Sequence, residues 1–335
     1  MVAELGRREV LWLLGSTAAA WPTTVWTQPQ PGRQRKVGVL LGLADDSEAR
    51  ARVNVFERRL QDLGWKIGQD LHVEYRFAAG SADSMRNSAE ELVGLRPDVI
   101  LGHSTPVVTA LVQASRTVPI VFVVVSDPIG SGFVTSMARP GGSITGFTNL
   151  QDTITGKHLS ILNEIVPKLV RVALMYNPDS ATQSGAYYMG AFIDSAKEVG
   201  VAPIRAKVRT PADIERIISE LGDQSGSGLI IMPDNFTTVQ RKVIVGLAAR
   251  YRIPTIYPYR YFADEGGLLS YGVDVMDLFR RAPEYIDRIL RGANPGDLPV
   301  QAPTKFEMVV NLGTAKALGV SIPKILLASA DAIIE

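Results

Sequence analysis

Short apolar runs alternate with longer amphipathic stretches along most of this chain. Runs at 36–42 and 71–77 are separated by a polar loop and a helical stretch. The same succession recurs with runs at 171–176 and 202–208, offset by about 135 residues. Apolar runs of this length between turn residues are typical of buried strands. The pattern therefore predicts one strand–loop–helix–strand unit that occurs twice.

Each unit continues with a second pair of short apolar runs. Those at 97–102 and 118–122 correspond to 228–232 and 253–257 in the second half. The later run of each pair is entered through a proline, and these two prolines lie 135 positions apart. Each half therefore reads as alternating strands and helices.

Apolar strands that alternate with helices indicate parallel sheets covered on both faces. The predicted fold class is α/β, with two Rossmann-like lobes whose parallel sheets are joined by hinge strands. Ligands of such sheets bind outside the carboxyl ends of the strands. When two lobes face each other, the loops at those ends line one cleft.

The chain continues past the second unit. A strand at 266–272, a helix at 274–291 and an extended piece at 306–310 are predicted to return to the first lobe and cross again. Several crossing segments restrain twisting and favour hinge closure.

The expected lobes are therefore discontinuous in sequence. The first comprises residues 36–148 with 272–296, and the second comprises 149–271 with 297–335.

The N-terminus has the layout of an export signal, which we expect over residues 1–27. Arg7 and Arg8 precede an apolar core at 10–14 and small residues at 15–20. The paired arginines suit the twin-arginine route, and an ordinary Sec signal fits equally. Because the apolar run is too short to span a bilayer, we expect an exported periplasmic protein.

Composition narrows the function classes. The chain has 335 residues, a net charge of +1 and no cysteine, which gives no footprint for nucleic acid and excludes disulfides, a thiol nucleophile and a lipid-modified cysteine. Only three histidines are present, so we expect no metal site.

Enzyme signatures are also missing from the sequence. The first strand is followed by one glycine rather than a dinucleotide fingerprint. The nearest approach to a hydrolase elbow, Gly226-Ser227-Gly228, precedes a strand instead of following one. A ligand-sensing transcription regulator shares such lobes, but it would carry a helix-turn-helix where this chain carries the export signal. We therefore expect a binding protein without a cofactor.

Six motifs give the chain a resemblance to a known family. They are IVFVVVSDP (120–128), SMARPGGSITG (136–146), PTIYPYR (254–260), GGLLSYG (266–272), PTKFE (303–307) and AKALG (315–319). The chain resembles the ABC-transporter substrate-binding proteins related to bacterial tryptophan-binding periplasmic proteins. The resemblance implies the type I periplasmic-binding fold, solute import and an ABC permease as partner.

The first lobe offers six candidate ligand contacts: Asp45, Ser104, Thr105, Asp127, Thr148 and Asn149. Ser104 and Thr105 open a helix, where hydroxyls and free N–H groups suit a carboxylate, although helix capping also explains them. Asp127 could hold an ammonium group, or it could only initiate a turn before Pro128.

The second lobe offers six more: Asn177, Ser180, Asp234, Phe236, Tyr257 and Tyr271. Five aromatic residues fall within 257–271, and pockets use such side chains as walls with a polar end. Phe262 is expected to pack a helix instead, Arg260 to pair with Asp264, and His103 to be a loop residue.

These residues predict a small-molecule ligand resembling an amino acid, with its carboxylate on hydroxyls and its amine on Asp127 or Asp234. An aromatic acid without the amine is the alternative. We expect a monomer that delivers its ligand to the permease. A sensor subunit that presents the ligand to a receptor is the alternative function.

Overall fold

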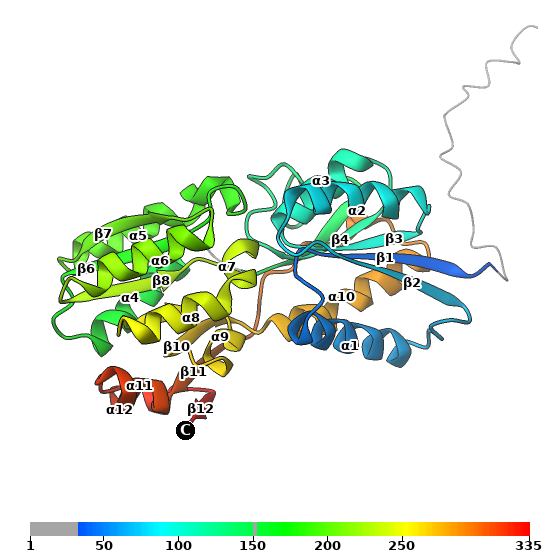
Figure 1. The fold of residues 1–335 in the computed structure, drawn as a ribbon. Coiled ribbons are helices and arrows are strands. Elements are labelled where there is room, and N and C mark those ends of the chain that lie inside the picture. The colour runs from blue at the N-terminus through cyan, green and yellow to red at the C-terminus, as the bar shows by residue number, and fades with distance from the viewer. Residues whose placement is uncertain (1–32, 150–152) are drawn as a thin grey trace, which may run out of the picture.

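The computed structural model describes residues 33–149 and 153–335, which form two α/β lobes lying side by side (Figure 1). The predicted export segment at 1–27 lies outside the described residues. No helix in the described ranges is both long and apolar enough to cross a membrane.

The first lobe is built on a parallel sheet. In sheet order its strands are β2 (Leu71–Phe77), β1 (Arg35–Leu41), β3 (Val99–His103), β4 (Ile120–Val125) and β5 (Ile144–Thr148). Helices α1 (Ser47–Asp62) and α10 (Val275–Leu290) pack together on one face, and α2 (Ala82–Gly94) and α3 (Thr105–Ala114) on the other. Alternate residues of β1 enter the two cores: Val39 contacts the first pair of helices and Leu40 the second. Burial of both faces explains the uninterrupted apolar runs.

The second lobe repeats this arrangement in a larger sheet. In sheet order its strands are β12 (Ala332–Ile334), β11 (Phe306–Asn311), β10 (Leu269–Val273), β9 (Thr255–Tyr257), β8 (Ser227–Ile231), β6 (Arg171–Tyr176) and β7 (Ala202–Lys207). The β10–β11 pair is antiparallel and the other pairs are parallel. Helices α4 (Ile154–Ile165) and α5 (Ala186–Glu198) contact each other, as do α6 (Pro211–Gly222) and α8 (Arg241–Arg250).

Shorter elements complete the described chain. They are η1 (Thr182–Gly185), α7 (Asn235–Val239), α9 (Arg260–Asp264), η2 (Pro295–Asp297), α11 (Leu312–Leu318) and α12 (Lys324–Ala328). The last two lie with β12 at the outer edge of the second lobe (Figure 1).

The chain passes between the lobes three times, between β5 and α4, between β10 and α10, and between η2 and β11. After η2 it stays with the first sheet beyond the expected limit of 296, because the Gln301 N–H donates to the Gly146 carbonyl and its own carbonyl accepts from Thr148. The predicted pair of Rossmann-like lobes is confirmed.

One crossing strand requires a glycine for close approach. A Cβ at Gly272 in β10 would lie 1.9 Å from the Pro258 carbonyl oxygen. We expect Gly272→Ala to lower the free energy of unfolding by about 2 kcal/mol, measured by urea denaturation. The control is Gly190→Ala in α5, where a Cβ meets nothing within 4 Å and where alanine should add about 0.5–1 kcal/mol. Equal effects of the two substitutions would contradict the steric explanation.

Candidate functional site

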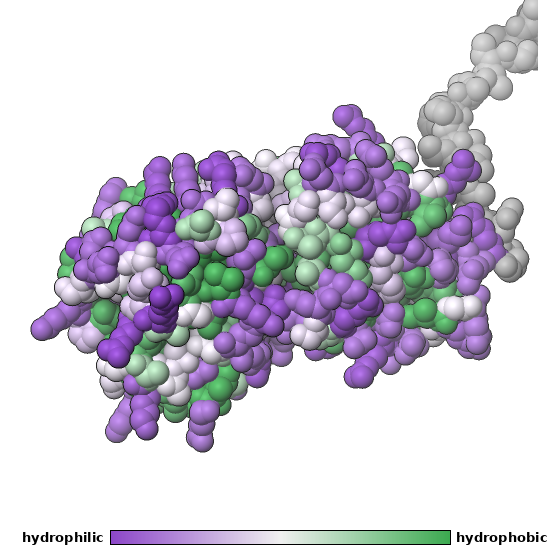
Figure 2. All heavy atoms as spheres, viewed as in Figure 1, coloured by the Kyte–Doolittle hydropathy of each residue, from purple (hydrophilic) through white to green (hydrophobic). Residues whose placement is uncertain are grey.

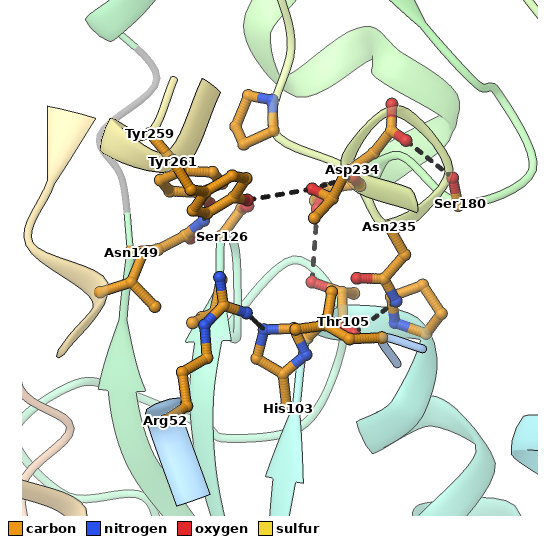
Figure 3. A pocket seen from close by; sticks show the side chains of 18 residues that line it. Arg52, His103, Thr105, Ser126, Asn149, Ser180, Asp234, Asn235, Tyr259 and Tyr261 are labelled. Atoms are coloured by element: carbon orange, nitrogen blue, oxygen red, sulfur yellow. Dashed lines mark hydrogen bonds between the residues drawn. The ribbon is translucent and has the colours of Figure 1, made fainter. Parts of the chain in front are cut away.

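A pocket lies between the lobes at the carboxyl ends of both sheets, and we call it the cleft pocket (Figure 3). The first lobe lines it with Leu43, Arg52, His103, Ser104, Thr105, Pro106, Val124, Ser126, Asn149 and Val275. The second lobe lines it with Ser180, Thr182, Pro233, Asp234, Asn235, Thr238, Tyr259 and Tyr261. The cavity measures about 20 Å³, which is room for one water molecule.

The small cavity follows from direct contacts between the lobes. Asn235 Nδ2 donates to Ser104 Oγ at 2.8 Å, and Tyr188 Oη donates to Ser126 Oγ at 2.6 Å. Gly42 makes room for the first of these, since a Cβ there would lie 2.3 Å from Asn235 Nδ2. The described residues are therefore in a closed arrangement, and a ligand larger than water requires the lobes to part or the side chains to rotate.

An ion pair and an amide hydrogen bond also join the two lobes at the edge of the cleft pocket. Arg241 of α8 contacts Asp46 of the first lobe at 2.7 Å and Glu265 of its own lobe at 2.8 Å. Gln183 Nε2 donates to an oxygen of Asp127 at 2.6 Å. In Figure 2 hydrophilic side chains cover much of both lobes on the face shown, with apolar patches toward their junction.

Two strained residues hold the first-lobe wall of the pocket. Ser104 has φ of 82° and Val124 has φ of 59°, and a β-branched residue rarely adopts such a value. Val124 coincides with a register shift in β4 between Val123 and Val125. Such bulges re-aim the residues around them, and here the next loop residue, Ser126, turns into the pocket. Backbone strain of this kind concentrates at ligand sites.

Arg52 is the first-lobe charge of the pocket. It occupies the buried face of α1, in line with Ala49, Val53 and Phe56, and is 1% exposed. Its guanidinium lies 3.4 Å from His103 Nε2 and stands 5.2 Å from the centre of the Tyr261 ring. Figure 3 shows it reaching from the helix toward the middle of the pocket.

His103 ends β3 and is neutral. Burial, and then the positive charge of Arg52, hold its pKa well below the usual value of 6.5. Because the arginine can only donate, Nε2 is the acceptor and Nδ1 carries the proton. That Nδ1 is buried and has no partner among the described residues.

Asp234 is the second-lobe charge. It caps α7 by accepting from the Thr237 N–H at 2.8 Å, and it also accepts from the Asn177 N–H at 3.0 Å and Ser180 Oγ at 3.2 Å. Burial raises its pKa to about 6, against the lowering effect of these donors. A carboxylate has about four acceptor positions, and the Thr237 side chain also acts on this one, so a ligand would meet the charge of Asp234 rather than a vacant acceptor position.

Tyr259 and Tyr261 form the wall between these charges. Asn149 Nδ2 donates to Tyr259 Oη at 2.9 Å, which leaves the tyrosine hydrogen available. Asn149 Oδ1 is buried and has no partner among the described residues. Burial raises the pKa of both tyrosines, so they stay protonated and can donate.

The structure brings five of the predicted contacts into the pocket: Ser104, Thr105, Asn149, Ser180 and Asp234. Asn177 lies behind Asp234 and offers its N–H to it. Asp127 lies at the rim, where it also accepts from the Gly130 N–H as expected of a turn.

The other predicted contacts lie elsewhere. Asp45 pairs with Arg50 on the surface, and Thr148 donates to the Gln301 carbonyl. The three aromatic residues pack against other apolar side chains. Phe236 packs against the core that contains Val39, Tyr257 stacks on Phe262, and Tyr271 stacks on Phe306. Arg260 pairs with Asp264 as predicted, at 3.4 Å.

Several pocket residues escaped the sequence prediction, or were assigned another role: Arg52, His103, Ser126, Thr182, Asn235, Thr238, Tyr259 and Tyr261. Arg52 could have been found from the sequence, because a charged residue on the apolar face of a helix is unusual and indicates a specific role. The aromatic cluster at 257–271 pointed to the tyrosines as a group, but the alternation along 257–261 does not say which of them face the cleft.

Comparison with known proteins identifies the family of this chain. A family model described as ABC transporter substrate binding protein matches residues 36–334. A tyrosine-binding protein of Clostridioides difficile is 25% identical over 286 residues, covering 85% of this chain and 81% of that protein.

Solved structures are similar over the same range. A conserved domain protein from Vibrio cholerae has a TM-score of 0.83 and 27% identity, covering 90% of this chain and 100% of that one. An ABC domain from Streptococcus pneumoniae in complex with L-Trp has a TM-score of 0.82 and 21% identity, with the same coverage. Both confirm the fold.

The rim ion pair predicts a shift in lobe closure. Asp46→Asn keeps the cap of α1, whose Ala49 N–H it accepts, but removes the charge facing Arg241. We expect the closed-to-open ratio to fall about fivefold, the equivalent of about 1 kcal/mol. Spin labels at Glu90→Cys and Lys197→Cys, one per lobe in a chain without cysteine, report it by electron–electron distance measurement.

Asp45→Asn is the matched control for this experiment. Asp45 pairs with Arg50 within the first lobe, with side chains 47% and 55% exposed, and such pairs contribute little. Its distance distribution should match that of the unsubstituted chain. A shift of the same size in both variants would show that the Asp46–Arg241 pair does not set closure.

Proposed function

The chain belongs to the ABC transporter substrate-binding protein family, and from this premise we propose that it is the solute-binding protein of an ABC importer. It holds a small amino-acid-like or aromatic carboxylate ligand between its lobes. The single observation that carries the proposal is the cleft pocket, where a buried cation and a buried carboxylate come from different lobes.

This arrangement converts ligand binding into lobe closure. A ligand that contacts Arg52 on one lobe and Asp234 on the other has its full set of partners only when the lobes are together. Differential affinity for the closed state shifts the equilibrium toward it. A permease in the inner membrane reads that closed shape, and no chemical step on the ligand is needed.

The tyrosine-binding relative and the L-Trp complex support an aromatic amino acid as the ligand class. Export by the segment at 1–27, through the Tat or Sec route, would place the lobes in the periplasm. We expect a monomer, with the first lobe comprising residues 36–148 plus 272–301 and the second comprising 149–271 plus 302–335.

A thermal-shift screen tests the proposal. The chain from Gln28 onward is heated with L-tyrosine, L-tryptophan, L-phenylalanine, aliphatic amino acids and aromatic acids. A ligand present at a hundredfold excess over its Kd stabilises the native state by about 2.7 kcal/mol, a clear rise in the unfolding temperature. If no carboxylate compound raises it, the importer proposal fails.

The pKa of Asp234 predicts how affinity depends on pH. Its carboxyl titrates near pH 6 in the described state, and a bound ammonium lowers that value. Protonation below pH 6 therefore competes with the amine, and affinity should be about tenfold weaker at pH 5 than at pH 7.5. His103 stays neutral over this range because burial and Arg52 depress its pKa.

Calorimetric titrations at the two pH values measure the effect. Asp234→Asn keeps the cap of α7 and should bind equally weakly at both values. The matching acid without an amine should show no pH dependence in the unsubstituted chain. A pH-independent affinity for the amino acid would place its amine away from Asp234.

A further inference from the structure

The buried guanidinium of Arg52 is in contact with no carboxylate among the described residues. Across residues 33–149 and 153–335 it forms no ion pair, and its buried Nε has no hydrogen-bond partner. The charge of Arg52 acts on two carboxylates without contacting either of them: Glu48, half-buried one turn earlier on α1, and Asp46, which caps α1. A buried charge without a partner is strongly unfavourable. The presence of Arg52 at this position is therefore explained if a negatively charged group of a ligand pairs with it.

We propose that Arg52 is the carboxylate anchor of the cleft pocket, and that the ligand lies with its carboxylate on the first lobe and its amine toward the second. This inference rests on the proposed function and assigns the residue and the direction of binding within it.

The groups that hold Arg52 are neutral. Its guanidinium donates to His103 Nε2 at 3.4 Å and stands over the rings of Tyr261 and Phe279, at 5.2 and 6.0 Å from their centres. An imidazole acceptor, the Tyr261 side chain and two aromatic faces fix the orientation of the guanidinium and leave it without a carboxylate in contact. Its forked donors suit the two oxygens of a carboxylate.

Arg241 shows the contrast within the same interface. It is also buried, at 6% exposure, but two carboxylates neutralise it, Asp46 at 2.7 Å and Glu265 at 2.8 Å. Two arginines of similar burial therefore have opposite surroundings, and only Arg52 lines the cleft pocket.

The neighbours of Arg52 on the first lobe add further donors. Ser104 Oγ already accepts from Asn235, so its own hydrogen is free. The protonated Nδ1 of His103 has no partner. Thr105 begins α3, a helix of ten residues, whose free N–H groups at Thr105 and Val107, on either side of Pro106, favour an anion. The pocket's carboxylate, Asp234, lies on the second lobe, and this division of charge sets the direction of the ligand.

A structural role and an anchoring role predict opposite effects on stability. If Arg52 only supported the fold, its removal would lower the unfolding temperature. If it is an unpaired anchor, Arg52→Met, which fills similar volume without the charge, should unfold at the same temperature or higher. Arg241→Met is the matched control and should unfold several degrees lower, because it leaves two carboxylates unpaired.

Binding is measured with L-tyrosine and L-tryptophan against tyramine and tryptamine, which lack only the carboxylate. The unsubstituted chain should prefer each amino acid over its amine at least a hundredfold. Arg52→Met should lose that preference through weaker binding of the amino acid alone. Arg52→Lys should recover part of it, since the charge returns without the fork.

The outcomes separate the two proposals. If amino acids stabilise both the unsubstituted chain and Arg52→Met equally, the anchor is wrong and the importer proposal stands. A lower unfolding temperature for Arg52→Met, comparable with that of Arg241→Met, also overturns the anchor. If no carboxylate compound stabilises the unsubstituted chain, both proposals fall.

Discussion

Parallel strands force the polar groups of this molecule into one place. Every strand of the first sheet ends at the same edge, and the second sheet presents the corresponding edge to it. Loops and helix starts follow each strand there, so hydroxyls, amides and N–H groups collect between lobes whose interiors are otherwise apolar. The pocket is a consequence of strand direction before any particular side chain is chosen.

The energetics of closure follow from the kind of contact that joins the lobes across this edge. Asn235 to Ser104, Tyr188 to Ser126 and Asn149 to Tyr259 are polar pairs, and so are the rim pairs at Asp46 and Asp127. Each such contact contributes about 0.5–1.5 kcal/mol net, because open lobes bond to water instead. The difference in free energy between the closed and open forms is therefore much smaller than the gross strength of these contacts. A ligand's own contacts are large enough to decide between them.

The fold could be predicted from the sequence because a strand that is buried on both faces of its sheet has apolar residues at successive positions. The edge strand β12, three residues long, carried no such signal and was missed. Two of the predicted contacts that come soon after a strand, Ser104 after β3 and Asp234 after β8, do line the cleft pocket. The sequence could not give the direction of a side chain, as with Tyr257, which faces the core while Tyr259 lines the pocket.

Arg52 shows what local pattern cannot resolve. On α1 it interrupts the apolar face of an amphipathic helix, since the residues in line with it are apolar. Whether such an arginine is paired depends on residues far away in sequence: His103 lies 51 positions on, and Arg241 meets Asp46 across 195 positions. A structural arginine thus differs from a ligand-binding one in whether the fold brings a carboxylate into contact with its guanidinium. A buried arginine held only by a neutral imidazole and aromatic rings keeps the field that a carboxylate ligand needs.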